Sequence, residues 1–140
     1  MAKNFLITRP IHDEHMAYLY DFSNDVIKVT KTQKEIHVTD LKGANANRAN
    51  VERSLTKENP RLVFLNGHGD KRTVFGHADQ PVLDEKNISL TKNKIIYSLA
   101  CDSLEELGPI SIGKGATAYI GYKAKFMFVR DPSRSSTPSK

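Results

Sequence analysis

The chain has 140 residues, which suits a single domain that buries about two thirds of its unfolded surface. Its 39% hydrophobic and 26% charged residues are typical of a globular protein, and no apolar run approaches the ~18 residues of a membrane span. The net charge of +5 suggests nucleic-acid binding, but the basic residues are scattered and no zinc-finger or RNA-binding motif occurs, so we expect no nucleic-acid partner.

The compartment is indicated by the amino terminus and by the cysteine content. The amino terminus lacks the apolar stretch of a signal peptide. The single cysteine, Cys101, cannot form an internal disulfide, which agrees with a reducing compartment and leaves its thiol free. We therefore expect a cytoplasmic protein without a membrane partner.

The chain begins with a predicted strand and a long predicted helix. Residues 4–8 are β-prone and are soon followed by Pro10, which fixes a turn, so they predict the first strand. From Asp13 the apolar residues recur at steps of three and four, which predicts an amphipathic helix to about Thr30. The β-branched residues within 26–30 are also compatible with an extended chain.

The next two segments predict a strand and a peripheral helix. Residues 35–41 alternate apolar and polar side chains, as in a half-buried strand near a sheet edge. Residues 45–58 carry an asparagine cap and few apolar residues, so we expect a crossover helix at the periphery.

Two short apolar runs end abruptly in reactive side chains. Residues 62–65 stop at Asn66-Gly67, just before His68, and residues 95–100 stop at Cys101. Such runs suit parallel strands that are buried on both faces. Because chemistry gathers at the carboxyl ends of parallel strands, neighbouring strands would bring the imidazole and the thiol to one crevice.

The remaining segments complete the pattern of elements. Residues 73–75 and 81–83 flank a glycine-containing loop and predict a small β-hairpin beside the crevice. Residues 104–114 predict a helix, interrupted by Gly108-Pro109, and residues 117–121 predict a buried strand.

The alternation of strands and helices predicts the fold class. We expect one α/β domain over residues 1–130, a three-layer sandwich with a mostly parallel central sheet. Residues 126–129 are a candidate last strand, and residues 131–140, rich in serine, proline and charge, predict a disordered tail. Periodicity alone does not separate this sheet from a flavodoxin-like or Rossmann-like one.

A thiol and an imidazole at one crevice are sufficient for acyl transfer. Near neutral pH a free thiol is mostly protonated, and the nearby His68 can take the proton of Cys101 or stabilise its thiolate. Gly67 and Gly69 leave the imidazole uncrowded and let the backbone approach a ligand closely, as an oxyanion site requires.

These motifs resemble the caspase-like cysteine peptidases, whose His-Gly and Ala-Cys dipeptides end two adjacent strands. The segments similar to the CHAT and gingipain-like prokaryotic branch are Asn66-Gly67-His68-Gly69, Ser98-Leu99-Ala100-Cys101-Asp102-Ser103 and Gly115-Ala116-Thr117-Ala118-Tyr119-Ile120-Gly121. The resemblance covers about residues 4–129. Leu99 stands where a caspase has glutamine, no glycine follows Asp102, and the His-to-Cys spacing is shorter than the ~50 residues of caspases, so the resemblance is to a compact relative.

The resemblance implies a caspase-like fold and a cysteine endopeptidase that acts on a peptide or protein substrate. Cys101 is then the nucleophile, His68 the general base and acid, and the backbone N–H groups of Gly69 and Cys101 form the oxyanion hole. No cofactor is needed, and a regulatory partner or a homodimer is left open. The alternatives are a non-catalytic caspase-fold interaction module and an unrelated α/β ligand-binding domain.

The candidate substrate-binding residues are Arg9, Asp70, Leu99 and Asp102. Relatives that cut after basic residues often carry an aspartate two positions before the cysteine, where this chain has Leu99. Arg9 lies roughly where caspases supply an arginine for acidic substrates. Because Asp70 and Asp102 flank the dyad, we favour a basic residue before the cut.

The other histidines do not predict a metal site. His12 and His15 stand three apart, but only two acidic residues lie near them in sequence, so we expect solvated surface histidines. His77 lies in the predicted hairpin turn, and it forms no known zinc spacing with the dyad. We therefore predict no metal.

Overall fold

The computed structural model describes residues 3–124, in which strands and helices alternate. The strands are β1 (Lys3–Arg9), β2 (Ile36–Lys42), β3 (Leu62–Asn66), β4 (Gly69–Asp70), β5 (Thr73–Phe75), β6 (Pro81–Leu83), β7 (Ile95–Leu99) and β8 (Ala118–Ile120). The helices are α1 (Glu14–Lys31), α2 (Arg48–Arg53) and α3 (Leu107–Gly113), and the short helical turns are η1 (Gly43–Asn45), η2 (Ser54–Glu58), η3 (His77–Asp79) and η4 (Ile88–Thr91).

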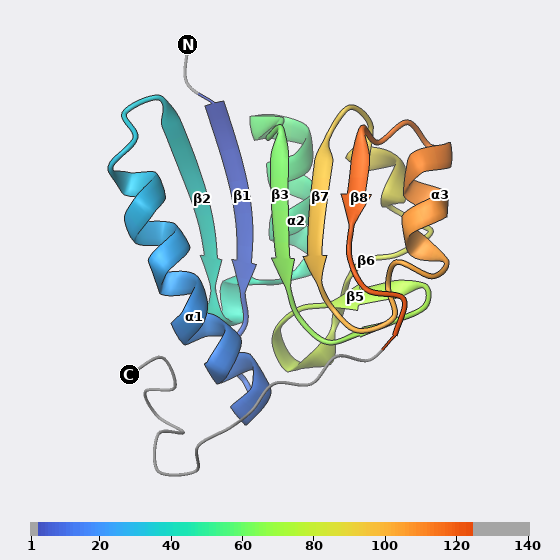
Figure 1. The fold of residues 1–140 in the computed structure, drawn as a ribbon, viewed down its shortest axis with the longest axis horizontal. Helices are drawn as coiled ribbons and strands as arrows, with labels where there is room; N and C mark the ends of the chain where they lie inside the picture. The colour runs from blue at the N-terminus through green and yellow to red at the C-terminus, as the bar shows by residue number, and fades with distance from the viewer. Residues whose placement is uncertain (1–2, 125–140) are drawn as a thin grey trace.

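Five strands form a parallel sheet in the order β2-β1-β3-β7-β8, as Figure 1 shows. The two strands that precede His68 and Cys101 are immediate neighbours, because β3 pairs with β7 from Leu62 opposite Ile95 to Asn66 opposite Leu99. The predicted α/β class with a mostly parallel central sheet is confirmed.

Alternation along the central strands divides the apolar residues between two cores. In β1, Leu6 belongs to the larger core, whereas Phe5 and Ile7 belong to a smaller core with Ile27 of α1. The larger core consists of Leu6, Leu41, Ala46, Val51, Leu55, Val63, Leu65, Val74, Val82, Leu83, Ile88, Ile96, Ala100, Leu107 and Tyr119. Figure 1 accordingly shows α1 in front of the sheet and α2 behind it, which makes three layers.

The two faces of the sheet are covered unequally. On the side of the larger core, α2, the β5–β6 hairpin and α3 all contribute buried residues. On the other side α1 contacts β1, β2 and β3. On the part of this face that α1 does not cover, the exposed apolar side chains are Leu62, Ile95 and Ile120.

Helix α1 matches its prediction, including the β-branched stretch near its end. Asp13 is its N-cap and accepts a hydrogen bond from the Met16 N–H at 2.8 Å, which satisfies one of the first-turn donors. Lys28 and Lys31 in the last turn suit the negative end of the helix dipole. The stretch is helical rather than extended because Ile27 packs against the smaller core.

The other predicted helices are shorter than expected. Residues 43–45 form the separate turn η1, so α2 begins only after Asn47. Asn47 caps it by accepting a hydrogen bond from the Asn50 N–H at 2.9 Å. The chain then continues as the π-helical turn η2. Helix α3 begins only at Leu107, since a proline is tolerated in the first turn but not in a helix interior, and Pro109 sits in that turn.

The predicted hairpin is present, and the ends of the chain differ from expectation. β5 and β6 pair antiparallel, and β4 joins them as a third strand. Within residues 3–124, β8 lies at the edge of the sheet, with Tyr119 buried and Ile120 exposed. The predicted last strand at residues 126–129 and the predicted tail at 131–140 lie outside this range. Within residues 3–124, the helices lack the length and apolar character needed to cross a membrane.

Candidate functional site

His68 lies in a tight connection between β3 and β4, and its backbone is held against β5. The His68 carbonyl accepts a hydrogen bond from the Phe75 N–H at 2.9 Å. A Cβ atom on the preceding Gly67 would lie 1.9 Å from the Phe75 carbonyl oxygen, so only glycine fits there. These contacts fix the point from which the imidazole projects.

The segment that carries His68 packs directly on the segment that carries Cys101. A Cβ atom on Gly69 would lie 2.6 Å from the Cys101 carbonyl oxygen and 2.8 Å from the Cβ of Ala100. The close approach follows from the pairing of β3 with β7, whose carboxyl ends lie side by side. The structure therefore brings the predicted oxyanion residues, Gly69 and Cys101, together.

Cys101 is a free, half-buried thiol at a sharp turn of the backbone. Asp102, which follows it, has a left-handed conformation with φ of 61°, a region that aspartate tolerates better than most residues. The Asp102 N–H donates to the Ala124 carbonyl at 3.3 Å. The chain thus reverses immediately after the thiol and leaves it at the end of β7.

Asp13 is a partner of His68 that the sequence did not reveal. His68 Nε2 lies 2.7 Å from Asp13 Oδ2, while Asp13 Oδ1 accepts from the Met16 N–H. Partial burial by itself raises the pKa of the Asp13 carboxyl. Hydrogen bonds from Met16 and His68 and the nearby charges of His68 and His12 lower that pKa by more, so the net shift is downward. An ionised Asp13 accepts the Nε2 proton and favours the tautomer in which Nδ1 carries the lone pair.

Arg9 does not line a crevice, which corrects the expectation from sequence. Its side chain is only 2% exposed, and it makes paired hydrogen bonds to Asp40 at 2.9 and 3.1 Å. The guanidinium also donates to the Tyr20 carbonyl and lies 4.1 Å from the centre of the Tyr20 ring. Arg9 therefore joins β1, α1 and β2, and its charge is not available to a substrate.

Asp70 and Asp102 line the same depression, beside charges of the opposite sign. It is an open surface depression of about 580 Å³. The other residues around it are Lys71, Arg72, Thr73 and Glu106. Neither residue of the dyad is among them, and Asp70 Oδ1 accepts from the Arg72 N–H at 2.9 Å.

Leu99 is the last residue of β7 and is half-buried. Alternation along the strand gives it the same face as Tyr97 and Ile95, which is the side of the sheet that α1 covers in part. Leu99 therefore borders the end of the sheet on which the dyad segments meet.

Four of the five histidines gather near the carboxyl ends of β1 and β3. The ring centroids of His12 and His68 lie 6.0 Å apart, those of His12 and His77 5.4 Å, and those of His15 and His68 6.1 Å. His15 is exposed, but the side chain of His12 is only 13% exposed, so the expectation of a solvated His12 was wrong.

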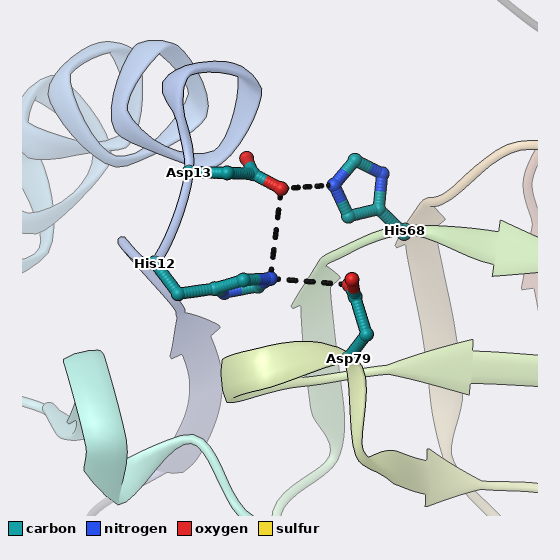
Figure 2. Close-up of side chains that lie close together, drawn as sticks. All are labelled: His12, Asp13, His68 and Asp79. Atoms are coloured by element: carbon teal, nitrogen blue, oxygen red, sulfur yellow. Dashed lines mark hydrogen bonds and ion pairs between the residues drawn. The ribbon is translucent and has the colours of Figure 1, made fainter.

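Two carboxylates complete this cluster, as Figure 2 shows. His12 Nε2 lies 3.1 Å from Asp79 Oδ1 and 3.6 Å from Asp13 Oδ2. One ligand-type atom from each of His12, Asp13, His68 and Asp79 lies within 4.8 Å of all the others. The residues come from three loops, after β1, after β3 and between β5 and β6, so no local spacing announces them.

Comparison with known proteins leaves the family open. No protein-family model matches the chain, and no curated protein matches it significantly. The function is therefore argued from the residues and geometry of the site.

Proposed function

We propose that the protein is a cysteine endopeptidase of the compact, caspase-like prokaryotic type, in which Cys101 is the nucleophile and His68 the general base and acid. The observation that carries the proposal is the packing of Gly69 on the backbone of Ala100 and Cys101. A thiol and an imidazole thereby follow adjacent parallel strands at the end of the sheet where α/β proteins place their chemistry.

In this mechanism His68 takes the proton of the Cys101 thiol, and the thiolate attacks the carbonyl carbon of the peptide bond. The N–H groups of Gly69 and Cys101 stabilise the oxyanion of the tetrahedral intermediate. His68 then gives the proton to the leaving amine, which departs and leaves a thioester. Water, deprotonated by His68, hydrolyses the thioester and regenerates the thiol.

Asp13 has a defined part in the same proposal. Its carboxylate holds Nε2 of His68 at 2.7 Å, so it orients the ring and stabilises the imidazolium that forms when the thiol loses its proton. The arrangement corresponds to an acid–histidine–cysteine triad. Asp13 touches neither substrate nor nucleophile in this scheme, so it is a positioning residue.

The residue before the cut is proposed to be basic. Arg9 is buried, so it cannot bind an acidic side chain of the substrate. Asp70 and Asp102, which could bind a basic one, line one depression next to the dyad segments. Lys71 and Arg72 on the same rim oppose this preference in part. The alternative is an apolar pocket bordered by Leu99, which would give a preference for apolar side chains.

The proposal is tested by the rate at which a peptidyl acyloxymethyl ketone labels the thiol. We expect it to label Cys101 in the native protein, and we expect His68→Ala to slow labelling by about 100-fold or more, the usual contribution of general acid–base catalysis. His37→Ala is the matched control, because His37 is an exposed residue on the edge strand β2. Labelling is followed by intact mass, and circular dichroism checks each fold.

Two further variants separate the proposal from the non-catalytic alternative. Asp13→Asn should slow labelling less than His68→Ala does, because it disturbs the orientation of the base without removing it. Equal labelling rates in the wild type and in His68→Ala would contradict the proposal. They would favour the interaction module instead, since an exposed thiol needs no base.

A further inference from the structure

The cluster of His12, Asp13, His68 and Asp79 has the composition of a transition-metal site. Two imidazole nitrogens and two carboxylate oxygens are the ligands that Zn²⁺ binds in four-coordinate sites, at bond lengths of about 2.0–2.2 Å. Imidazole ligands also argue against Ca²⁺ and Mg²⁺, which prefer oxygen. Figure 2 shows the four side chains pointing toward one another from three loops, with His12 and Asp13 adjacent on one of them.

The distances within the cluster suit a small ion. In a tetrahedron with the bond lengths of zinc, ligand atoms lie about 3.4 Å apart. His68 Nε2 and Asp13 Oδ2 are 2.7 Å apart, His12 Nε2 and Asp79 Oδ1 are 3.1 Å apart, and His12 Nε2 and Asp13 Oδ2 are 3.6 Å apart. No pair of ligand atoms exceeds 4.8 Å, so side-chain movements of about an ångström would complete the geometry.

Charge and hydrogen bonding point in the same direction. With neutral imidazoles, the two carboxylates give the cluster a double negative charge that a divalent cation would neutralise. The side chain of His12 is largely enclosed, with 13% of it exposed. Its Nε2 faces the carboxylates of both Asp13 and Asp79, and a single N–H cannot donate a good hydrogen bond to both.

We propose that His12, Asp13, His68 and Asp79 form a binding site for a divalent first-row transition metal, with Zn²⁺ as the best fit. His68 is shared between this site and the proposed dyad. A metal on Nε2 binds the lone pair of that nitrogen, so the single proton of the neutral ring moves from Nε2, where Asp13 now accepts it, to Nδ1. Such a ring cannot accept the thiol proton. Zn²⁺ therefore inhibits the peptidase, a consequence that rests on the proposed function, whereas the metal site itself does not.

The metal site is tested by Zn²⁺ binding in competition with a chromophoric indicator. The measurement uses the Cys101→Ser protein, because a free thiol is itself a zinc ligand. We expect one Zn²⁺ per chain. Asp79→Asn and His12→Ala should each weaken binding by at least about tenfold, since even groups outside the ligand set cost about 10- to 100-fold. His37→Ala is the matched control and should leave affinity unchanged.

Several outcomes would overturn the metal site. The site is refuted if the Cys101→Ser protein does not bind Zn²⁺. It is also refuted if Asp79→Asn and His12→Ala leave the Zn²⁺ affinity of that protein unchanged, or if His37→Ala weakens the affinity as much as they do. Asp79 is exposed, so its variant is expected to keep the fold even if His12→Ala does not, and circular dichroism checks both.

The regulatory consequence has its own measurement. Zn²⁺ should slow labelling of Cys101 in the wild type, and Asp79→Asn should relieve that inhibition. If Zn²⁺ binds with the expected pattern of variants but labelling does not change, the metal site stands and the role of His68 as the base falls. If inhibition persists in Asp79→Asn, Zn²⁺ acts elsewhere and the shared use of His68 is refuted.

Discussion

Arg9 occupies the end of β1, where the resemblance suggested a specificity residue, and instead ties three elements together. Its guanidinium meets Asp40 of β2 and both Tyr20 and Ser23 of α1. A buried pair of this kind is expensive to disrupt, because removing one partner leaves the other charge without compensation. Its value to the protein is therefore structural.

Arg9→Ala should lower the free energy of unfolding by about 3–5 kcal/mol, because Asp40, itself only 14% exposed, would lose its partner. Arg72→Ala is the control. Arg72 also pairs with carboxylates, but its side chain is 58% exposed, so the loss should stay within about 1 kcal/mol. Urea unfolding followed by circular dichroism measures both. Equal losses would show that the Arg9 pair is no more than a surface ion pair.

The difference between the residues that sequence revealed and those that it missed has a physical cause. His68 and Cys101 stood out because each follows a short apolar run, and the fold forms a strand from each of those runs. Asp13 and Asp79 lie in different loops, far apart in the sequence. Only folding brings Asp13 within hydrogen-bond reach of His68 and Asp79 within reach of His12. Asp13 could have been found from its place just beyond the end of β1.

At the scale of elements, the loops between β3 and β6 are held by backbone contacts that glycine alone permits. A Cβ atom on Gly67 would lie 1.9 Å from the Phe75 carbonyl oxygen, and one on Gly76 would lie 2.2 Å from the Ala46 carbonyl oxygen. The atoms in the way belong to the backbone, so they cannot turn aside as a flexible side chain could. These contacts place η3, and with it Asp79, beside His12.

Gly67→Ala should lower the free energy of unfolding by about 1–3 kcal/mol, the usual cost of overpacking, and should also slow labelling of Cys101 because His68 is displaced. Gly113→Ala is the matched control. A Cβ atom there meets nothing within 4 Å, and alanine suits the end of α3, so the variant should be neutral or more stable by up to about 1 kcal/mol. Unchanged stability and labelling in Gly67→Ala would mean that the loop relaxes and does not fix the imidazole.

Element types were largely predictable, whereas their ends depended on neighbours. The strands β1, β3 and β7 followed from apolar runs because burial on the sheet is what those runs encode. The start of α3 did not. Residues 101–106 form turns, and a Cβ atom on Gly108, in the first turn of α3, would lie 2.8 Å from Leu104 of those turns and 3.3 Å from Tyr119 of β8. The spacing of apolar residues within the segment cannot predict a contact with a distant strand.

At the scale of the whole molecule, the sheet is buried on one face across its width and on the other only in part. Ile95 and Ile96 of β7 show this within two adjacent residues, since Ile96 is 0% exposed in the larger core and Ile95, which faces the other side, is 36% exposed. Continuous apolar runs conceal this asymmetry, because both residues look equally suited to a buried strand. Beyond α1, the apolar side chains of Leu62, Ile95 and Ile120 are therefore exposed.

Ile96→Ala should therefore cost about 2–5 kcal/mol of unfolding free energy, through lost transfer energy and the cavity left in the larger core. Ile95→Ala removes the same atoms from the same strand, but its side chain already meets solvent, so we expect a loss below about 1 kcal/mol. Urea unfolding of both variants at low protein concentration makes the comparison, because an exposed apolar face can also be covered by association. If the two substitutions cost the same, Ile95 is buried in the protein as it exists in solution, and the face over β7 and β8 is covered there.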